Sequence, residues 1–326
     1  MTVFTIHAVN ATIEENDVKT PLTFSHNLIK EHNYENAQNF GKNLGVETSE
    51  NPFLCASFSN DGKTLDFVGT VHDNNPDSKI HTLTKNVLNA FAQTPYDPAK
   101  KVVILEGFTP QDATGSLHHI PFDILQGKQT YGELELAFEL ARTNNIAAFT
   151  GEKTYQDMGE KFIKNGFSFQ DHYWLTQALY LSESLYFKDS LIDLSSQSIT
   201  EILGAHMDRV NKDFPENPPF NPDQMITDLT NWMNEKFGRP LTTQEIGDIT
   251  CPNHTQNHYS TYTDSEHYLV KLKSFHQLQR DHDLLSRIES LMNQYDHVMV
   301  VYGSFHYYAL HDALSEKLGN PIYTFV

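Results

Sequence analysis

Four consecutive apolar residues, VVIL at 102–105, constrain the fold of this chain more than any other feature. A continuous apolar run of this length is typical of a β-strand that is covered on both faces. Segments with helical apolar spacing flank it at 79–93 and 131–145, and a short apolar stretch follows at 146–152. Strands and helices therefore alternate, which favours an α/β fold with a mixed, mainly parallel central sheet and helices on both faces.

The stretch from 52 to 72 predicts a β-hairpin that feeds this sheet. The segments PFLCASFS and TLDFVGTVH flank the sequence NDGK, in which Asp61-Gly62 is a strong two-residue turn signal. Beyond the hairpin, we expect a helix around 24–43, one long helix or two at 265–295, a strand at 297–306, a helix at 307–319 and a strand at 321–326. We expect the last strand to rejoin the sheet.

Residues from about 154 to 285 differ from the rest of the chain because their patterns are helical. Amphipathic or apolar helical segments at 169–187 and 225–238 are separated by the proline-dense sequence FPENPPFNPDQ. We interpret this region as a helical insertion or cap in a single α/β domain that spans 1–326. With 39% hydrophobic residues, a chain of this length can bury a substantial core.

Charge and composition restrict the function classes and the compartment. The chain has 42 acidic and 23 basic residues, a net charge of -19, which would repel nucleic-acid phosphates. Cys55 lies in an apolar strand and Cys251 precedes a proline, which suggests reduced thiols. We see no signal peptide and no segment of membrane-spanning length. The sequence therefore predicts a cytoplasmic protein without a nucleic-acid partner; it does not predict the oligomeric state.

Three predicted strands end on polar residues that a purely structural strand would not need. These are His72 in VGTVH, Glu106 in VVILEG and His306 in VVYGSFH. In open α/β sheets, ligands bind beyond the carboxyl ends of the strands, where the loops converge. A carboxylate directly after four apolar residues would cost several kcal/mol if it were buried without a partner. We therefore expect these three side chains to meet at one edge of the sheet.

The motifs FVGTVH, VILEG and VVYGSFH together resemble those of TraB/Tiki/GumN-type proteins, in which two Gly-x-x-His motifs bracket a glutamate on a strand. The longer form GTVHDNN is similar to the signature of ChaN-type haem-iron uptake lipoproteins. The segment QRDHDLLSRI resembles a helix start in the same superfamily, which includes the erythromycin esterases. The chain has Thr70 and Val71 before the first histidine, where esterase- and ChaN-type proteins have an acidic residue.

This resemblance implies a site built from His72, Glu106, Arg280 and His306, with Asp281 in support. It implies hydrolysis of an amide or ester bond in a small-molecule or peptide substrate, so we expect an enzyme of the hydrolase class. The ChaN-like motif implies an alternative, a protein that binds haem or a metal without turnover.

The residue types allow two chemistries. His72, Glu106 and His306 could bind a divalent metal such as Mn or Zn, with a coordinated water as nucleophile. Without a metal, Glu106 would act as general base, a histidine would donate a proton and Arg280 would stabilise the oxyanion. The sequence leaves both open. For Glu152 we expect an acid near a helix N-terminus rather than a wall of the site, and for His81 an exposed side chain.

Overall fold

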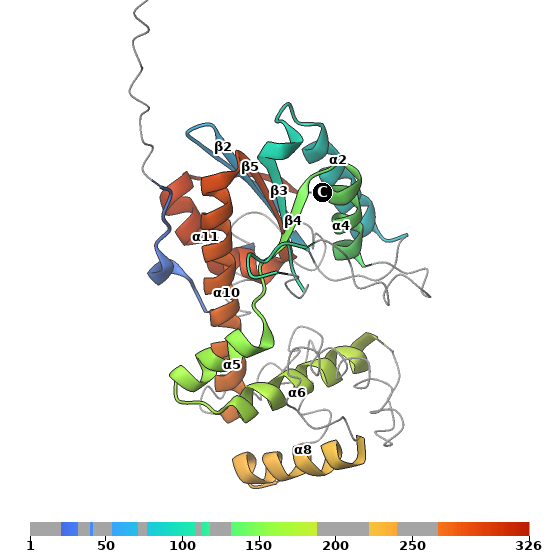
Figure 1. Ribbon diagram of the computed structural model, residues 1–326, viewed down its shortest axis with the longest axis vertical. Coiled ribbons are helices and arrows are strands. Elements are labelled where there is room, and N and C mark those ends of the chain that lie inside the picture. Colours follow the sequence, from blue (N-terminus) through green and yellow to red (C-terminus); the bar gives the residue numbers. More distant parts are fainter. Residues whose placement is uncertain are drawn as a thin grey trace, which may run out of the picture.

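The computed structural model describes residues 21–31, 40–41, 54–70, 77–107, 112–117, 132–187, 222–239 and 267–325. In this part of the chain, six strands form one mixed sheet in the order β4-β3-β5-β2-β1-β6 (Figure 1). They are β1 (Leu54–Asn60), β2 (Lys63–Thr70), β3 (Lys101–Leu105), β4 (Ala147–Thr150), β5 (His297–Gly303) and β6 (Ile322–Phe325). Strands β4, β3, β5 and β2 run parallel, and β1 is antiparallel to both β2 and β6. The predicted α/β fold is confirmed.

The antiparallel end of the sheet contains the predicted hairpin. Asn60 pairs with Lys63, and the two residues between them, Asp61 and Gly62, have φ angles of 50° and 79°. Positive φ at both central positions defines the turn that matches the twist of paired strands. The last strand rejoins the sheet as expected, because β6 pairs with β1 at the edge.

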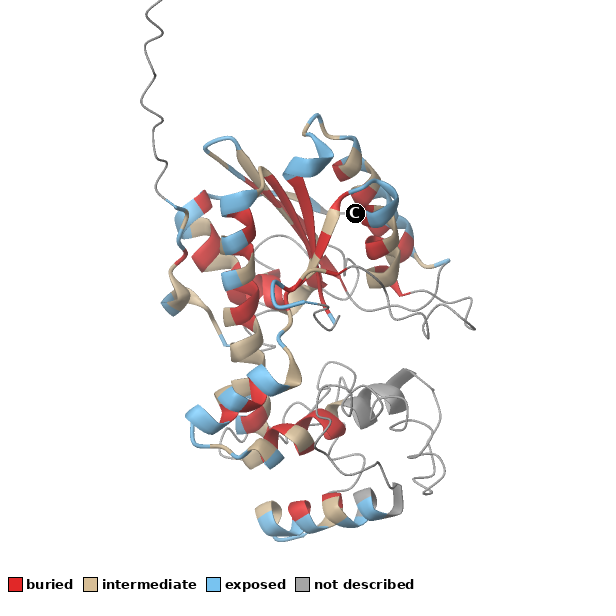
Figure 2. Ribbon diagram, in the orientation of Figure 1, coloured by how far each residue is buried: buried red, intermediate tan, exposed pale blue. Residues whose placement is uncertain are grey.

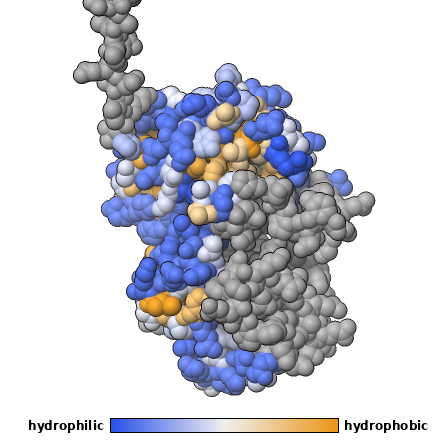
Figure 3. All heavy atoms as spheres, viewed as in Figure 1, coloured by the Kyte–Doolittle hydropathy of each residue, from blue (hydrophilic) through white to orange (hydrophobic). Residues whose placement is uncertain are grey.

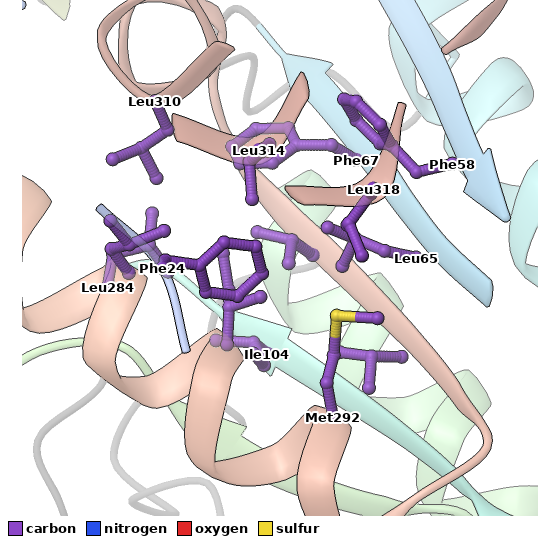
Figure 4. Close-up of a cluster of buried hydrophobic side chains, with 14 of the residues drawn as sticks. Phe24, Phe58, Leu65, Phe67, Ile104, Leu284, Met292, Leu310, Leu314 and Leu318 are labelled. Carbon is purple, nitrogen blue, oxygen red and sulfur yellow. The ribbon is translucent and has the colours of Figure 1, made fainter. Parts of the chain in front are cut away.

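Two helices cover each face of the sheet (Figure 1). Helices α2 (Lys79–Gln93) and α4 (Glu133–Thr143) pack on one face, and α10 (Tyr268–Gln294) and α11 (Ser304–Leu318) on the other. Val102 and Ile104 of β3 belong to the core beneath α10 and α11, where Figure 4 labels Ile104. Val103 and Leu105 belong to the opposite core. The run VVIL is apolar throughout because both faces of its strand are buried (Figure 2).

Helix α10 joins the sheet to a separate cluster of helices. It is one continuous helix of 27 residues. Leu269 and Leu272 near its start pack with α5 (Tyr155–Lys164), α6 (Phe169–Phe187) and α8 (Pro222–Phe237), whereas Leu284 and Met292 pack in the core of the sheet. The described part of 154–285 is helical as predicted. The end of the predicted insertion, at about 285, is not a structural boundary, because α10 continues through it to Gln294.

Two predicted segments differ from the structure. The helix expected around 24–43 is replaced, over 21–31, by extended chain around the short 3-10 helix η1 (His26–Leu28). Residues 40–41 are helical, and 32–39 and 42–43 lie outside the described residues. The strand expected at 297–306 ends at Gly303, where α11 begins. A second 3-10 helix, η2 (Pro98–Lys100), leads into β3.

The described surface is polar. On the face in Figure 3 it is mostly hydrophilic, and among the described residues only two large apolar side chains are exposed, Ile163 and Ile322. No helix in the described ranges is both long and apolar enough to cross a membrane.

One buried carboxylate, Asp171, holds the helical cluster together. It accepts hydrogen bonds from Trp232 Nε1 of α8 at 3.0 Å and from the Tyr268 hydroxyl of α10 at 2.8 Å. Ser168 donates to it through both its backbone N–H and its hydroxyl. Burial alone would raise the pKa of Asp171, but these hydrogen bonds outweigh burial and hold that pKa below its ordinary value.

Replacing Asp171 with asparagine should lower the free energy of unfolding by roughly 2–3 kcal/mol, because buried donors lose a charged acceptor. Urea denaturation followed by circular dichroism measures this change. Asp228→Asn on α8 is the matched control, since its bond from Gln224 is exposed; it should cost less than about 0.5 kcal/mol. Equal losses in the two variants would contradict a special role for Asp171.

Candidate active site at the carboxyl edge of the sheet

Glu106 directly follows β3 and is 7% exposed, so its charge must be compensated by the protein. Its Oε1 atom accepts a hydrogen bond from Arg280 Nη2 at 2.7 Å and lies 3.4 Å from His306 Nε2. Its Oε2 atom accepts the backbone N–H of Gly303 at 2.6 Å. Gly303 is the N-cap of α11, where the helix dipole also favours a negative charge.

Arg280 reaches the same point from α10. Its Nε and Nη2 atoms both donate to Glu152, which follows β4, and the shortest of these bonds is 2.6 Å. Its Nη1 atom donates to Gln277 one turn earlier, at 3.1 Å. Burial alone lowers the pKa of Arg280, but the charges of Glu152 and Glu106 outweigh it and hold that pKa well above its ordinary value. Arg280 is therefore a permanent cation between two carboxylates.

His306 lies in the first turn of α11, one turn beyond Gly303, and not at the end of a strand as predicted. Its Nδ1 atom is 2.6 Å from Asp281 Oδ1, and both residues are buried, at 3% and 0% exposure. Burial alone would lower the pKa of His306, but Asp281 and Glu106 outweigh burial and raise it to about 9. At neutral pH the ring is an imidazolium, with Nδ1–H directed at Asp281 and Nε2–H on the side of Glu106.

The structure therefore joins three of the four predicted catalytic residues, Glu106, Arg280 and His306, in one network. Asp281 is a direct member, as a partner of His306. Glu152 was expected to be an acid near a helix N-terminus, but Thr154 caps the following helix, α5. Glu152 is instead the second carboxylate partner of Arg280. These residues come from β3, α10, α11 and the end of β4 and meet at the carboxyl edge of the parallel strands.

The fourth predicted residue, His72, lies outside the described residues. Strand β2, which precedes it, ends at Thr70, which pairs with Gly303 in parallel register. At Gly69, the glycine of the first Gly-x-x-His motif, a Cβ atom would lie 3.2 Å from Ser304 Cα, closer than most side chains pack. The glycines of both motifs thus have structural roles: one allows β2 to approach α11, and the other binds Glu106.

Sequence reasoning missed two residues, Tyr302 and Gly151. Tyr302 Oη donates to Glu152 Oε1 at 3.3 Å, and its ring is edge-on to His306 at 5.2 Å between centroids. A Cβ atom at Gly151 would lie 2.8 Å from Tyr302 Cζ and 2.9 Å from Leu284 Cδ1. The alternation of β5 could have revealed Tyr302, because Val298, Val300 and Tyr302 share the face that α10 covers.

His81 was expected in solvent, but it is buried on α2. Its backbone N–H donates to Ser78, the N-cap residue, and its ring Nδ1 is 3.3 Å from the same hydroxyl. Helix α4 packs against α2. On the same side of the sheet, the buried Thr70 hydroxyl donates to Glu133 at 3.3 Å.

The described donors do not fit a metal centre. No group of three or more His, Cys, Asp or Glu side chains in the described ranges is arranged to hold a metal ion. The bond from Asp281 orients His306 as in many metal-binding histidines. However, Glu106 Oε1 is 2.7 Å from Arg280 Nη2, whose charge would repel a divalent cation. The ligand set of His72, Glu106 and His306 stays a prediction, since it includes a residue outside the described ranges.

Comparisons of the chain with protein-family models, with curated proteins and with solved structures found no match. The resemblance to TraB/Tiki/GumN-type proteins therefore stays a prediction from short motifs.

Proposed function

We propose that this protein is a hydrolase that cleaves an ester or amide bond in a small-molecule or peptide substrate. The observation that carries the proposal is the continuous network Asp281–His306–Glu106–Arg280–Glu152. It places an acidic imidazolium and a fixed guanidinium side by side, where loops of parallel strands converge. Perturbed titratable groups at such an edge are a recurring mark of functional sites.

His306 is the proton donor in this proposal. With a pKa of about 9 it carries a proton on Nε2 at neutral pH and can give it to the leaving oxygen or nitrogen. Asp281 is a positioning residue, because it holds Nδ1 and stabilises the imidazolium.

Arg280 stabilises the oxyanion that forms when water attacks the carbonyl carbon. Four of its five N–H groups are bound by Glu152, Glu106 and Gln277. Among the described residues the second Nη1–H has no hydrogen-bond partner, and in this proposal it donates to the oxyanion. The two carboxylates fix the plane of the guanidinium.

Glu106 is engaged by two donors in this arrangement, the guanidinium of Arg280 and the backbone N–H of Gly303. We therefore assign it to the positioning of Arg280 and His306. The general base that takes the proton from water is assigned to His72, which the second Gly-x-x-His motif mirrors. After each turnover, the proton on His72 must return to His306.

Hydrolysis of a panel of p-nitrophenyl esters and peptide p-nitroanilides tests the proposal. The wild-type protein should turn over at least one class, and His306→Gln or His72→Gln should lower kcat/KM by roughly 100-fold or more. Glu139→Gln, on the exposed face of α4, is the matched control and should keep full activity. Circular dichroism verifies that each variant is folded. Equal rates in the wild type and both histidine variants would contradict the assignment.

The alternative of haem or metal binding without turnover has its own signature. Metal analysis of the purified protein and of Glu106→Gln would show a stoichiometric divalent metal that the variant loses. Titration with haem would show a saturable absorption band that His306→Gln weakens. Either result, together with no hydrolysis of any substrate in the panel, would favour a binding protein over a hydrolase.

A further inference from the structure

Residues 21–31, which we call the strap, run across the outside of α10 and α11 (Figure 1). Leu22 exchanges two hydrogen bonds with the side chain of Asn293 on α10, at 2.8 and 2.9 Å. The N–H of Phe24 donates to Glu289 on α10 at 2.7 Å. At the other end, Lys30 donates its N–H to Ala309 O on α11 at 3.0 Å. The strap therefore bridges the two helices that carry Arg280, Asp281 and His306.

The strap also covers the core of the sheet. Phe24 is buried in the cluster that contains Leu284 and Leu310, and Figure 4 shows its ring among these side chains. Leu22, Leu28 and Ile29 are half-buried against the same cluster. Release of the strap would expose this apolar surface.

Between its two ends, the strap meets α10 through a pair of histidines. The rings of His26 and His282 meet edge to edge, with centroids 5.3 Å apart and planes within 2° of parallel. Their Nδ1 atoms are 3.1 Å apart, which is a hydrogen-bond distance. One Nδ1 must donate and the other must accept, so at most one of the rings can be an imidazolium while this bond exists. A second proton would point two N–H donors of two positively charged rings at each other.

The charged groups around this pair do not offset the repulsion between two protonated rings. Lys161 of α5 adds a positive charge near His282 and is paired with Asp283 at 2.5 Å; Asp281 is paired with His306. Burial, then His26 and Lys161, lower the pKa of His282, and the opposing effects of Asp281 and Asp283 do not compensate. The pKa of His282 is lower with the strap bound than the ordinary value it would have after release. Protonation of His282 therefore favours release of the strap as the pH falls below about 6.5.

Two other side chains of the strap, Ser25 and Lys30, contact carboxylates on α11. Ser25 donates to Glu316 of α11 at 2.8 Å, and Lys30 Nζ is 2.7 Å from Asp312. Burial alone would raise the pKa of Asp312, but Lys30 and His311 outweigh burial and lower that pKa, so this ion pair persists in mild acid. Between about pH 7.5 and pH 5.5, histidine side chains with ordinary pKa values change charge, whereas carboxylates with ordinary pKa values stay ionised.

We infer that residues 21–31 form an acid-released strap: below about pH 6.5, double protonation of the His26–His282 pair detaches the strap from α10 and uncovers the apolar cluster around Phe24. The device is independent of the proposed hydrolysis. It would couple mild acid to the helix that carries Arg280 and Asp281.

Hydrogen exchange of the full chain, read by mass spectrometry and corrected for intrinsic rates, tests this inference. The amides of Phe24 and Lys30 are the reporters, because both donate hydrogen bonds to the helices. Between about pH 7.5 and pH 5.5, their protection in the wild type should fall by about tenfold or more, the factor of one pKa unit. In His26→Gln and in His282→Gln, it should fall by less than about threefold.

Lys30→Met is the matched control. It removes the ion pair with Asp312, so it should lower strap protection at both pH values and keep the wild-type ratio between them. Amides in the middle of α11 should remain protected throughout, which separates strap release from global unfolding. An equal fall in the wild type and both histidine variants, or no fall in the wild type, would overturn the inference.

Discussion

Replacing Arg280 with methionine should lower the free energy of unfolding by roughly 3–5 kcal/mol near neutral pH. The substitution removes the cation that lies 2.7 Å from Glu106 and 2.6 Å from Glu152. Glu106 is buried, so its charge would lose its main compensation and the two carboxylates would repel each other. Urea denaturation at pH 7 measures the loss, and hydrolytic activity should be abolished in the same variant.

Two comparisons isolate the cause. Arg142→Met removes an arginine–glutamate pair on the exposed face of α4, with Glu139 at 2.7 Å, and should leave the unfolding curve unchanged. Adding Glu106→Gln and Glu152→Gln to Arg280→Met should recover much of the stability, since neutral amides need no cation. A loss below about 1 kcal/mol in Arg280→Met would show that the network does not depend on this charge.

Replacing Asp281 with asparagine should remove a pH-dependent part of the stability. The pKa of His306 is raised to about 9, above its ordinary value near 6.5, so the contribution is complete below about pH 6.5. It is lost as the pH rises through 9, because the unfolded chain releases this proton first. The wild type should therefore lose roughly 3 kcal/mol between about pH 6.5 and pH 9.5, and Asp281→Asn should show little of that slope.

Carbon-detected NMR titration of the His306 ring gives a direct measurement. In Asp281→Asn the pKa of His306 should fall by several units, since Asp281 is the largest of the effects that raise it against burial. Asp312→Asn is the matched control, because Asp312 forms a carboxylate–histidine pair with His311 at the surface. It should leave the alkaline slope intact. An unchanged His306 titration in Asp281→Asn would refute the role of Asp281.

The elements that sequence predicted correctly are those whose signal is local. The run at 102–105 indicates a strand buried on both faces whatever its neighbours are, and Asp61-Gly62 favours one turn geometry from its own backbone preferences. The strand limits were less certain. The predicted strand runs to His306, but β5 ends at Gly303 and α11 begins at Ser304.

The sequence predicted several residues of the candidate site but not the contacts between them. Glu106, Arg280 and His306 stood out because each is a polar group beside an apolar segment or a motif. Glu152 and Tyr302 did not, because nothing local distinguishes an acid after a strand from an acid before a helix. Their roles appear only when β4 and β5 present them to Arg280.

The sequence by itself determined the alternation of strands and helices around 102–105, the hairpin and the glutamate that needs a partner, because hydrophobic periodicity, turn preferences and the cost of a buried charge act over a few residues. Tertiary structure alone decided that Arg280 meets Glu106 across 174 positions of sequence and that His306 is held by Asp281. Those contacts depend on the crossing of α10 over the sheet. The protonation state of the site therefore belongs to the packed molecule and to no single motif.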